Sequence, residues 1–260
     1  MAYEFAKVDR EGPITIVTLN RPENLNALHP PSHLELDEIF NDFAADPDQW
    51  VAIVTGAGDR GFCAGNDLKF QASGQEVTAP ATGFAGLTAR YDLTKPLIAA
   101  VNGVAMGGGF EIALSCDIIL ASENALFALP EPRVGLVAGA GGVHRLPRMI
   151  GLQRAMSMIL TGRRVGAAEG KELGFVAEIT SPADLLDRAR AWAGEICESS
   201  PLAVRASKQA VMMGLDEDTV ADALRKQHEY PAYAALMKSE DYIEGPIAFS
   251  QKRKPVWKGR

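Results

Sequence analysis

The chain has 260 residues, and its 26 lysine and arginine residues against 33 aspartate and glutamate residues give a formal net charge of −7. This acidic balance argues against a nucleic-acid-binding protein, and a composition with 47% hydrophobic and 23% charged residues argues against disorder. The length suits one large domain, or one domain with a small appendage.

The cysteines and the N-terminal segment both point to the cytoplasm. Cys63, Cys116 and Cys197 form no CxxC pair, so we expect neither a disulfide framework nor a zinc site. The N-terminal segment carries acidic residues where a signal peptide needs an apolar stretch, and no run approaches the roughly 18 apolar residues of a membrane span. We therefore expect a soluble, unprocessed cytoplasmic protein with no membrane partner.

Hydrophobic periodicity predicts alternating strands and helices in the first part of the chain, and helices alone after Pro182. Strands are expected at 14–19, 51–55, 97–101, 118–121 and 126–128. Helices are expected at 32–45, 84–93, 110–115, 185–199, 201–213, 219–230 and 232–249. The recurring strand, loop and helix suit stacked ββα or βαβ modules. We expect an α/β core over 1–197 and a helical C-terminal region over 198–260.

The segment GAGDRG at 56–61 matches the GxGxxG pattern of dinucleotide-binding proteins, with Glu76 further along the chain as the candidate ribose ligand. In those proteins the third glycine opens a helix, whereas here it leads into FCAGNDL, which has no helical periodicity. An NAD-dependent oxidoreductase is therefore a minor alternative, which a titration with NADH would test.

Three glycines, 107–109, stand where a helix begins, so their N–H groups suit an anion or a developing oxyanion. The alternative is a turn that only lets two backbones pack closely. Glu111 follows one helical turn after Gly108 on an apolar helix, where burial raises a carboxyl pKa toward the range useful for proton transfer. Its alternative role is to complement the helix dipole.

Glu131 is a second candidate, because it stands between Pro130 and Pro132, which fix the direction of the backbone. The alternative is a solvated acid in a turn. Spacing alone does not bring Glu131 together with Glu111.

The remaining polar and aromatic residues suggest no metal site. The histidines form no HExxH or Cys/His cluster, so we interpret them as surface or structural residues and expect no catalytic metal. Phe84, Trp192 and Trp257 are interpreted as packing residues.

Four long segments together resemble the crotonase, or enoyl-CoA hydratase/isomerase, superfamily. They are FCAGNDL (62–68), the run from PLIAAVNG to DIILAS (96–122), FALPEPRVGLVAGAGGVHRLPRMIG (127–151) and LTGRRVGAAEGKELGFV (160–176). The likeness extends from RPENLNAL (21–28) to the helical tail. It implies a spiral of ββα units, a C-terminal helical region used for assembly into homotrimers or hexamers, and an acyl-CoA thioester substrate with no separate cofactor.

The resemblance also assigns roles to residues. The backbone N–H groups of Asn66 and Gly108 correspond to an oxyanion hole, Glu111 to the base that activates water, and Glu131 to the acid or base at the substrate α-carbon. Contacts to CoA, largely through backbone groups, correspond to Asn26, Ala27, Leu28, Ala64, Gly65, Asp67 and Leu68.

Two glutamates are typical of the hydratases of this family, so the resemblance favours reversible addition of water to a 2-enoyl-CoA. Segments 83–88, 107–114, 127–131 and 239–260 resemble one dehydratase branch that acts on a quaternary ammonium substrate. Asn66 departs from the aromatic residue of that branch, which weakens the case for a cation–π contact. Alternatives are a general short-chain hydratase, a Δ3-Δ2-enoyl-CoA isomerase, and an RNA-binding role that the acidic charge disfavours.

We also expect the basic tail, with Lys252, Arg253 and Lys254, to offset the repulsion between the acidic protein and the polyanionic CoA.

Overall fold

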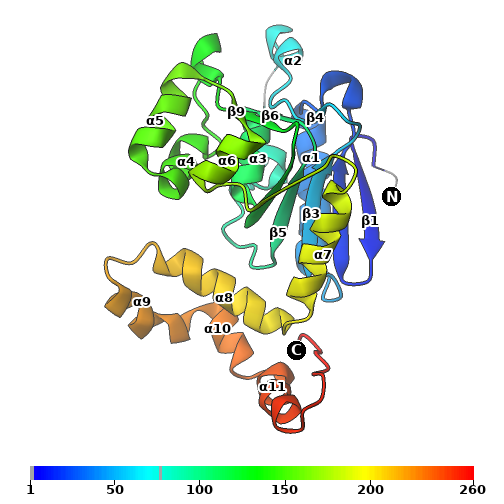
Figure 1. Ribbon diagram of the computed structural model, residues 1–260, viewed down its shortest axis with the longest axis vertical. Helices are drawn as coiled ribbons and strands as arrows, with labels where there is room; N and C mark the ends of the chain where they lie inside the picture. Colours follow the sequence, from blue (N-terminus) through cyan, green and yellow to red (C-terminus); the bar gives the residue numbers. More distant parts are fainter. Residues whose placement is uncertain (1–2, 76–77) are drawn as a thin grey trace.

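The computed structural model describes residues 3–75 and 78–260, so Glu76 lies outside the described residues (Figure 1). A large sheet has the strand order β1, β2, β3, β5, β7 and β10, in which β1 and β2 pair antiparallel and the other neighbours pair parallel. Its strands are Ala6–Glu11, Ile14–Leu19, Val51–Gly56, Leu97–Val101, Ile118–Ser122 and Glu178–Thr180. β3 and β5 are buried over their whole length, so they form the centre of the sheet.

A second, smaller sheet has the order β4, β6, β8 and β9. Its strands are Gly61–Cys63, Val104–Met106, Leu126–Ala128 and Val165–Gly166. Each of the pairs β3 and β4, β5 and β6, and β7 and β8 gives its first strand to the large sheet and its second to the small one. Because equivalent strands are parallel neighbours within each sheet, the chain advances as a spiral of repeated units. This confirms the predicted α/β fold.

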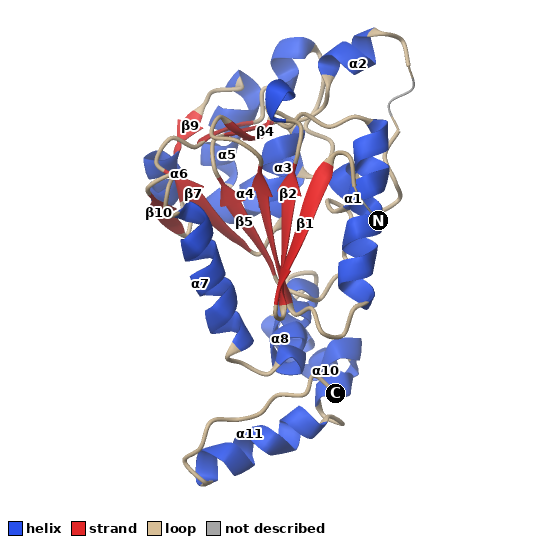
Figure 2. Ribbon diagram, turned by 90° about the vertical axis from the view of Figure 1, so that its right-hand side faces the viewer, coloured by secondary structure: helices blue, strands red, loops and turns tan. Residues whose placement is uncertain are grey.

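Helices cover both faces of the large sheet (Figure 2). Over one face, α1 (Pro30–Ala45) and α3 (Gly108–Ser115) enclose the main apolar core, to which Phe40, Phe62 and Phe110 contribute. Over the other face, α7 (Leu185–Cys197) packs its alanines against the sheet in a second core. The further helices of this part are α2 (Leu68–Ala72), α4 (Gly142–Ile150), α5 (Leu152–Thr161) and α6 (Ala167–Leu173).

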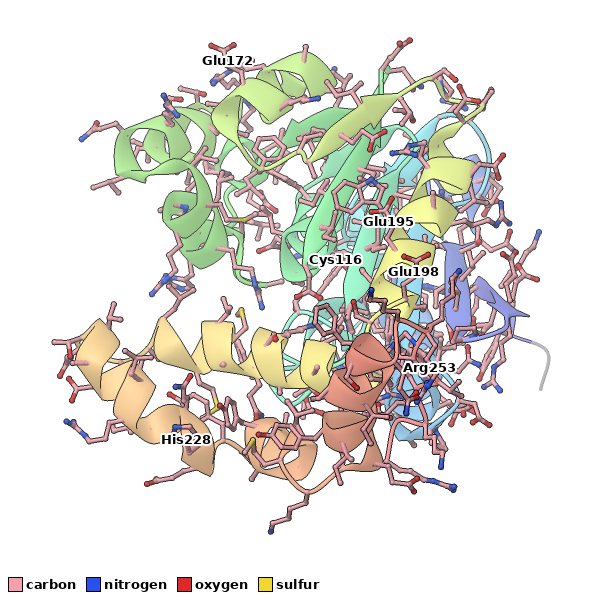
Figure 3. The ribbon with its side chains drawn as sticks, turned by 60° about the horizontal axis from the view of Figure 1, so that its bottom comes forward. Cys116, Glu172, Glu195, Glu198, His228 and Arg253 are labelled. Atoms are coloured by element: carbon pink, nitrogen blue, oxygen red, sulfur yellow. The ribbon has the colours of Figure 1, made fainter. Side chains whose placement is uncertain are left out.

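The last helices extend away from the sheets, at the end of the molecule opposite α2 (Figures 1 and 2). They are α8 (Pro201–Gly214), α9 (Val220–Lys226), α10 (Pro231–Leu236) and α11 (Glu240–Ser250). Seen from that end they form a layer of their own, with His228 on its outer side (Figure 3). None of the described helices is long and apolar enough to cross a membrane.

Three predicted helices differ in the structure, and several further elements were not predicted. The segment 84–93, expected as a helix, holds only a 3-10 turn at Phe84–Gly86, because Ala85 has a positive φ of 59°. The helix expected at 232–249 is two helices, α10 and α11, and the helix expected at 219–230 ends as an α-helix at Lys226. β1, β4, β6, β9 and β10 were not predicted.

Candidate active site

The turn into α3 is built by glycines that allow close backbone approach. Gly107 has φ 55°, in the left-handed region that favours glycine, and its N–H donates to the carbonyl of Ala128 at 2.9 Å. A Cβ at Gly109 would collide with the carbonyl oxygen of Cys63. The glycines therefore let the first turn of α3 lie directly against β4.

Asn66 and Gly108 present backbone N–H groups at the same place. The N–H of Leu28 donates to the carbonyl of Gly65 at 2.8 Å, and the N–H of Asp67 donates to the carbonyl of Leu28 at 2.7 Å. Because Asn66 lies between these two bonds, its own N–H points away from Leu28. A Cβ on Gly65 would lie 3.0 Å from the nitrogen of Gly108. Among the described residues, neither N–H of this pair donates a hydrogen bond. Two free donors side by side suit a developing oxyanion.

Phe84 packs against the core and over Gly108, which confirms its interpretation as a packing residue. A Cβ on Gly108 would lie 2.5 Å from two carbons of the Phe84 ring, so the ring rests on the first residue of α3. The buried His33 accepts a hydrogen bond from the N–H of Ala85 at 3.1 Å, and burial lowers the pKa of His33 to about 4. The neutral imidazole thereby holds the turn that carries Phe84. No sequence motif marks this contact, because it joins residues far apart in the chain.

Glu111 lies inside this first turn of α3 and is only 3% exposed. Its Oε1 accepts a hydrogen bond from the N–H of Gly142 at 2.8 Å. Burial raises the pKa of Glu111 to about 7, the charge of Glu131 acts in the same direction, and the Gly142 N–H and the Arg145 charge oppose the rise. Glu111 is therefore suited to exchange a proton near neutral pH.

Glu131 reaches the same turn from the start of a 3-10 helix, Glu131–Val134. Its Oε1 lies 2.7 Å from the point where Gly107 would carry a Cβ, so an alanine there would displace the carboxylate. Oε2 is buried and has no hydrogen-bond partner among the described residues. Burial raises the pKa of Glu131 as well. The fold thus brings two carboxylates to the N-terminal turn of α3, which sequence spacing could not establish.

The segments expected to contact CoA run side by side. The N–H of Ala64 donates to the carbonyl of Leu25 at 3.0 Å. This bond lies next to the one from the N–H of Leu28 to the carbonyl of Gly65. The side chain of Asn26 is fully buried and occupied, because its Oδ1 accepts from Arg21 and its Nδ2 donates to Gly61 and Ala57. The predicted CoA-contacting residues are therefore collected in one place: Asn26, Ala27, Leu28, Ala64, Gly65, Asp67 and Leu68.

Side chains stiffen the strip formed by residues 26–28 and 64–68. Arg21 bridges it by an ion pair to Asp67 at 3.1 Å and a hydrogen bond to the carbonyl of Ala27 at 2.6 Å. The side chain of Asn66 donates to Gln71 at 3.0 Å, so it faces α2 while its backbone faces Gly108. Leu68 is 47% exposed, which leaves an apolar side chain at the rim.

One expectation is confirmed by the geometry and another fails. Gly61 begins β4, not a helix, which confirms that the GxGxxG segment is no dinucleotide fingerprint. The basic tail lies at the opposite end of the same chain from α2, and Arg253 is paired with Glu244 at 2.6 Å, so assistance to CoA by that chain's own tail is wrong. Within residues 3–75 and 78–260, no three His, Cys, Asp or Glu side chains gather closely enough to hold a metal ion.

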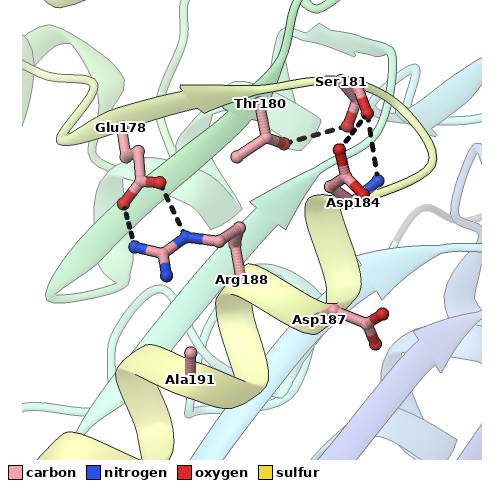
Figure 4. A pocket seen from close by; sticks show the side chains of 7 residues that line it. All are labelled: Glu178, Thr180, Ser181, Asp184, Asp187, Arg188 and Ala191. Atoms are coloured by element: carbon pink, nitrogen blue, oxygen red, sulfur yellow. Dashed lines mark hydrogen bonds and ion pairs between the residues drawn. The ribbon is translucent and has the colours of Figure 1, made fainter.

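A groove of about 440 Å³ lies elsewhere, at the start of α7 (Figure 4). Glu178 and Arg188 line it and form a two-pronged ion pair with N–O distances of 2.8 and 2.9 Å, and Ser181 donates to Asp184. These groups satisfy one another. The groove contains neither of the site carboxylates.

Comparison with known proteins shows the family of the chain. The sequence profile described as enoyl-CoA hydratase/isomerase matches residues 9–260. The chain is 45% identical to a carnitinyl-CoA dehydratase of Escherichia coli strain K12, over 99% of both chains, and 45% identical to that of Citrobacter koseri, over 96% of this chain and 97% of the relative.

Solved structures are also similar. An enoyl-CoA hydratase from Mycobacterium tuberculosis H37Rv has a TM-score of 0.92 and 38% identity, covering 98% of this chain and 99% of its own. An enoyl-CoA hydratase from Bacillus anthracis has a TM-score of 0.90 and 35% identity, covering 99% and 100%. The chain belongs to the enoyl-CoA hydratase/isomerase family.

Proposed function

We propose that the protein adds water reversibly across the 2,3 double bond of an acyl-CoA thioester, as a hydro-lyase of the carnitinyl-CoA dehydratase type. The observation that carries this proposal is the approach of the buried Glu111 and the half-buried Glu131 to two free N–H groups, those of Asn66 and Gly108. The likeness to carnitinyl-CoA dehydratases over nearly the whole chain supports the substrate type.

In the hydration direction, ionised Glu111 takes a proton from water while the water oxygen bonds to the β-carbon. The π electrons move toward the thioester, and the resulting enolate oxygen is stabilised by the N–H groups of Asn66 and Gly108. Protonated Glu131 then gives its proton to the α-carbon. The roles of the two carboxyl groups exchange on dehydration.

The protonation states fit these roles. A pKa of about 7 for Glu111 leaves a large fraction ionised at neutral pH, ready to act as a base. The raised pKa of Glu131, whose Oε2 is buried without a partner, favours a carboxyl group that holds its proton until the α-carbon requires it. The mechanism needs only the substrate, water and groups of the protein itself. We therefore propose that the CoA moiety belongs to the substrate and that no separate cofactor takes part.

The CoA moiety is proposed to lie along the strip formed by 26–28 and 64–68, held largely by backbone groups. Each chain is proposed to work in a homotrimer, or in a hexamer of two trimers, through residues 198–260, and the enzyme to act in the cytoplasm. The support for assembly is a set of exposed apolar side chains on α8–α11: Val211, Met212, Met213, Leu215, Val220, Leu224, Met237, Ile243, Ile247 and Phe249.

A panel of CoA thioesters tests the proposal. The enzyme is incubated with crotonobetainyl-CoA, crotonyl-CoA and a 3-enoyl-CoA, and products are identified by mass spectrometry and chromatography. Hydration of crotonobetainyl-CoA with the highest kcat/KM is expected. Preference for crotonyl-CoA would replace the substrate type with a general short-chain hydratase. Conversion of the 3-enoyl-CoA without hydration of either 2-enoyl-CoA would overturn the reaction and favour an isomerase.

A further inference from the structure

Arg145 is a half-buried cation on α4 whose contacts reach two separate parts of the site. Its Nη2 donates to the carbonyl of Thr88 at 2.8 Å, and its Nη1 donates to the carbonyl of Ala140 at 3.4 Å. The backbone N–H of Arg145 also donates to Gly141 at 2.8 Å. One guanidinium therefore ties the 138–142 loop to the 84–91 segment.

Each of the two side-chain hydrogen bonds of Arg145 connects it to a residue of the candidate site. On one side, Thr88 accepts a hydrogen bond from the N–H of Phe84 at 2.9 Å, and the Phe84 ring covers Gly108. On the other side, the loop that carries Ala140 ends at Gly142, whose N–H donates to Glu111. Arg145 donates no hydrogen bond to Glu111 or Gly108, and it lies outside the strip expected for CoA.

We propose that Arg145 is a positioning residue that holds the base Glu111 and the Phe84 cover of the oxyanion hole in one fixed arrangement. This inference rests on the proposed function. The side chain is held by more than its two hydrogen bonds, because its guanidinium also lies 5.9 Å from the centre of the Tyr91 ring. A planar, forked donor group can reach both carbonyls at once, whereas a lysine ammonium presents a single point.

Arg145 also acts on Glu111 through its charge. Among the described residues, the charged groups acting on Glu111 are Glu131 from the 3-10 helix and Arg145 from α4, and they act in opposite directions on its pKa. Removing the guanidinium takes away a positive charge that lowers the pKa of Glu111, so that pKa rises further. Fewer molecules then carry the ionised base at a given pH.

The first test is kinetic. Arg145→Met, Arg145→Lys and the control Arg148→Met are assayed with crotonyl-CoA across pH 6–9, a range that spans the Glu111 pKa of about 7. Arg148 lies three residues further on the same helix and is exposed, and among the described residues its side chain donates only to the carbonyl of His144. The control is expected to behave as the parent.

For Arg145→Met, kcat is expected to fall about 10–100-fold, with KM within about threefold, because misplacing a catalytic group costs rate more than binding. The acid limb of the pH profile is expected to move to higher pH, and to move less in Arg145→Lys, which keeps a positive charge. A Met variant with the parent kcat and the parent limb would overturn the inference. So would equal losses in both variants with no movement of the limb, because that result describes structural damage alone.

A second measurement works even if the chain catalyses another reaction. The free energy of unfolding is measured at fixed protein concentration from pH 5 to 8 for the parent, Arg145→Met, Glu111→Gln and the double variant. Arg145→Met is expected to steepen the fall in stability with rising pH, and Glu111→Gln to abolish that difference. The same steepening in both backgrounds would contradict the coupling. Failure of the parent to hydrate any enoyl-CoA would instead count against the proposed function.

Discussion

The spiral around α3 and the layer formed by α8–α11 follow different physical rules. In the spiral, large apolar side chains such as Phe110 and Phe127 are fully buried, and one of the buried charged side chains, Glu111, stands where proton transfer is proposed. In the layer, Leu215, Val220 and Phe249 are 76%, 77% and 88% exposed. The difference teaches that the first region buries its largest apolar side chains within one chain, whereas the second carries exposed apolar side chains that suit contact with other copies.

Between the two regions, the largest loss of activity is expected on substitution of Glu111 in the spiral. Glu111→Gln removes the base but keeps the shape and an oxygen that accepts from Gly142, so kcat for hydration is expected to fall about 10²–10⁴-fold with the fold intact. Steady-state assays with crotonyl-CoA, together with circular dichroism, measure both. Unchanged kcat in a folded variant would show that the buried carboxylate is not the base.

Glu111→Gln is expected to lower activity but to raise stability relative to the parent at higher pH. Because burial raises the pKa of Glu111 from 4.5 to about 7, the folded state binds the proton more tightly than the unfolded state, so stability falls as pH rises through about 7. Glu111→Gln is expected to gain up to about 3 kcal/mol on the parent between pH 4.5 and pH 8. Urea unfolding at both pH values measures this. A variant whose stability follows the parent at both pH values would refute the buried, proton-binding environment.

The layer is tested at Phe249. Phe249→Asp is expected to weaken association by about 2 kcal/mol or more, since exposed aromatic side chains commonly dominate interfaces. Sedimentation at micromolar concentration measures the loss of oligomer. Leu34→Asp is the matched control, because Leu34 is also an exposed apolar residue, 61% exposed, but lies on α1, outside the layer. Equal dissociation by both variants, or by neither, would remove the distinction between the two regions.

The smallest effect is expected within the layer. Glu244→Ala breaks the pair with Arg253, whose side chains are 20% and 40% exposed. Partly exposed ion pairs are worth little, so the midpoint of thermal unfolding should barely change. Thermal unfolding at low and high salt checks this, and a large drop in the midpoint would show that the tail is a structural anchor.

Sequence patterns captured the elements whose burial is continuous. β2 and β5 have the predicted bounds, because ITIVTL and LIAAV are apolar runs that end at turns. β1 was not predicted because most of its residues are exposed and AKVDRE has no apolar alternation. β4 and β6 have three residues each, which is too short for periodicity to show.

The site was predictable only in part. Glu111 follows from its place on an apolar helix, and Glu131 from its two prolines. Their meeting at Gly107 depends on how β8 runs beside β6, which spacing does not encode. Phe84 and Arg145 carry no motif at all, because each acts through backbone carbonyls or ring contacts that exist only after folding.

The most direct test of the account concerns Glu131. Crotonyl-CoA is hydrated in D2O by the parent and by Glu131→Gln, and the 3-hydroxybutyryl-CoA is analysed by mass spectrometry. The parent is expected to place a single deuterium at the α-carbon, and the variant to lose about 10²–10⁴-fold in rate while staying folded. Parent-like turnover with α-deuteration by Glu131→Gln would contradict the claim that two carboxylates divide the chemistry.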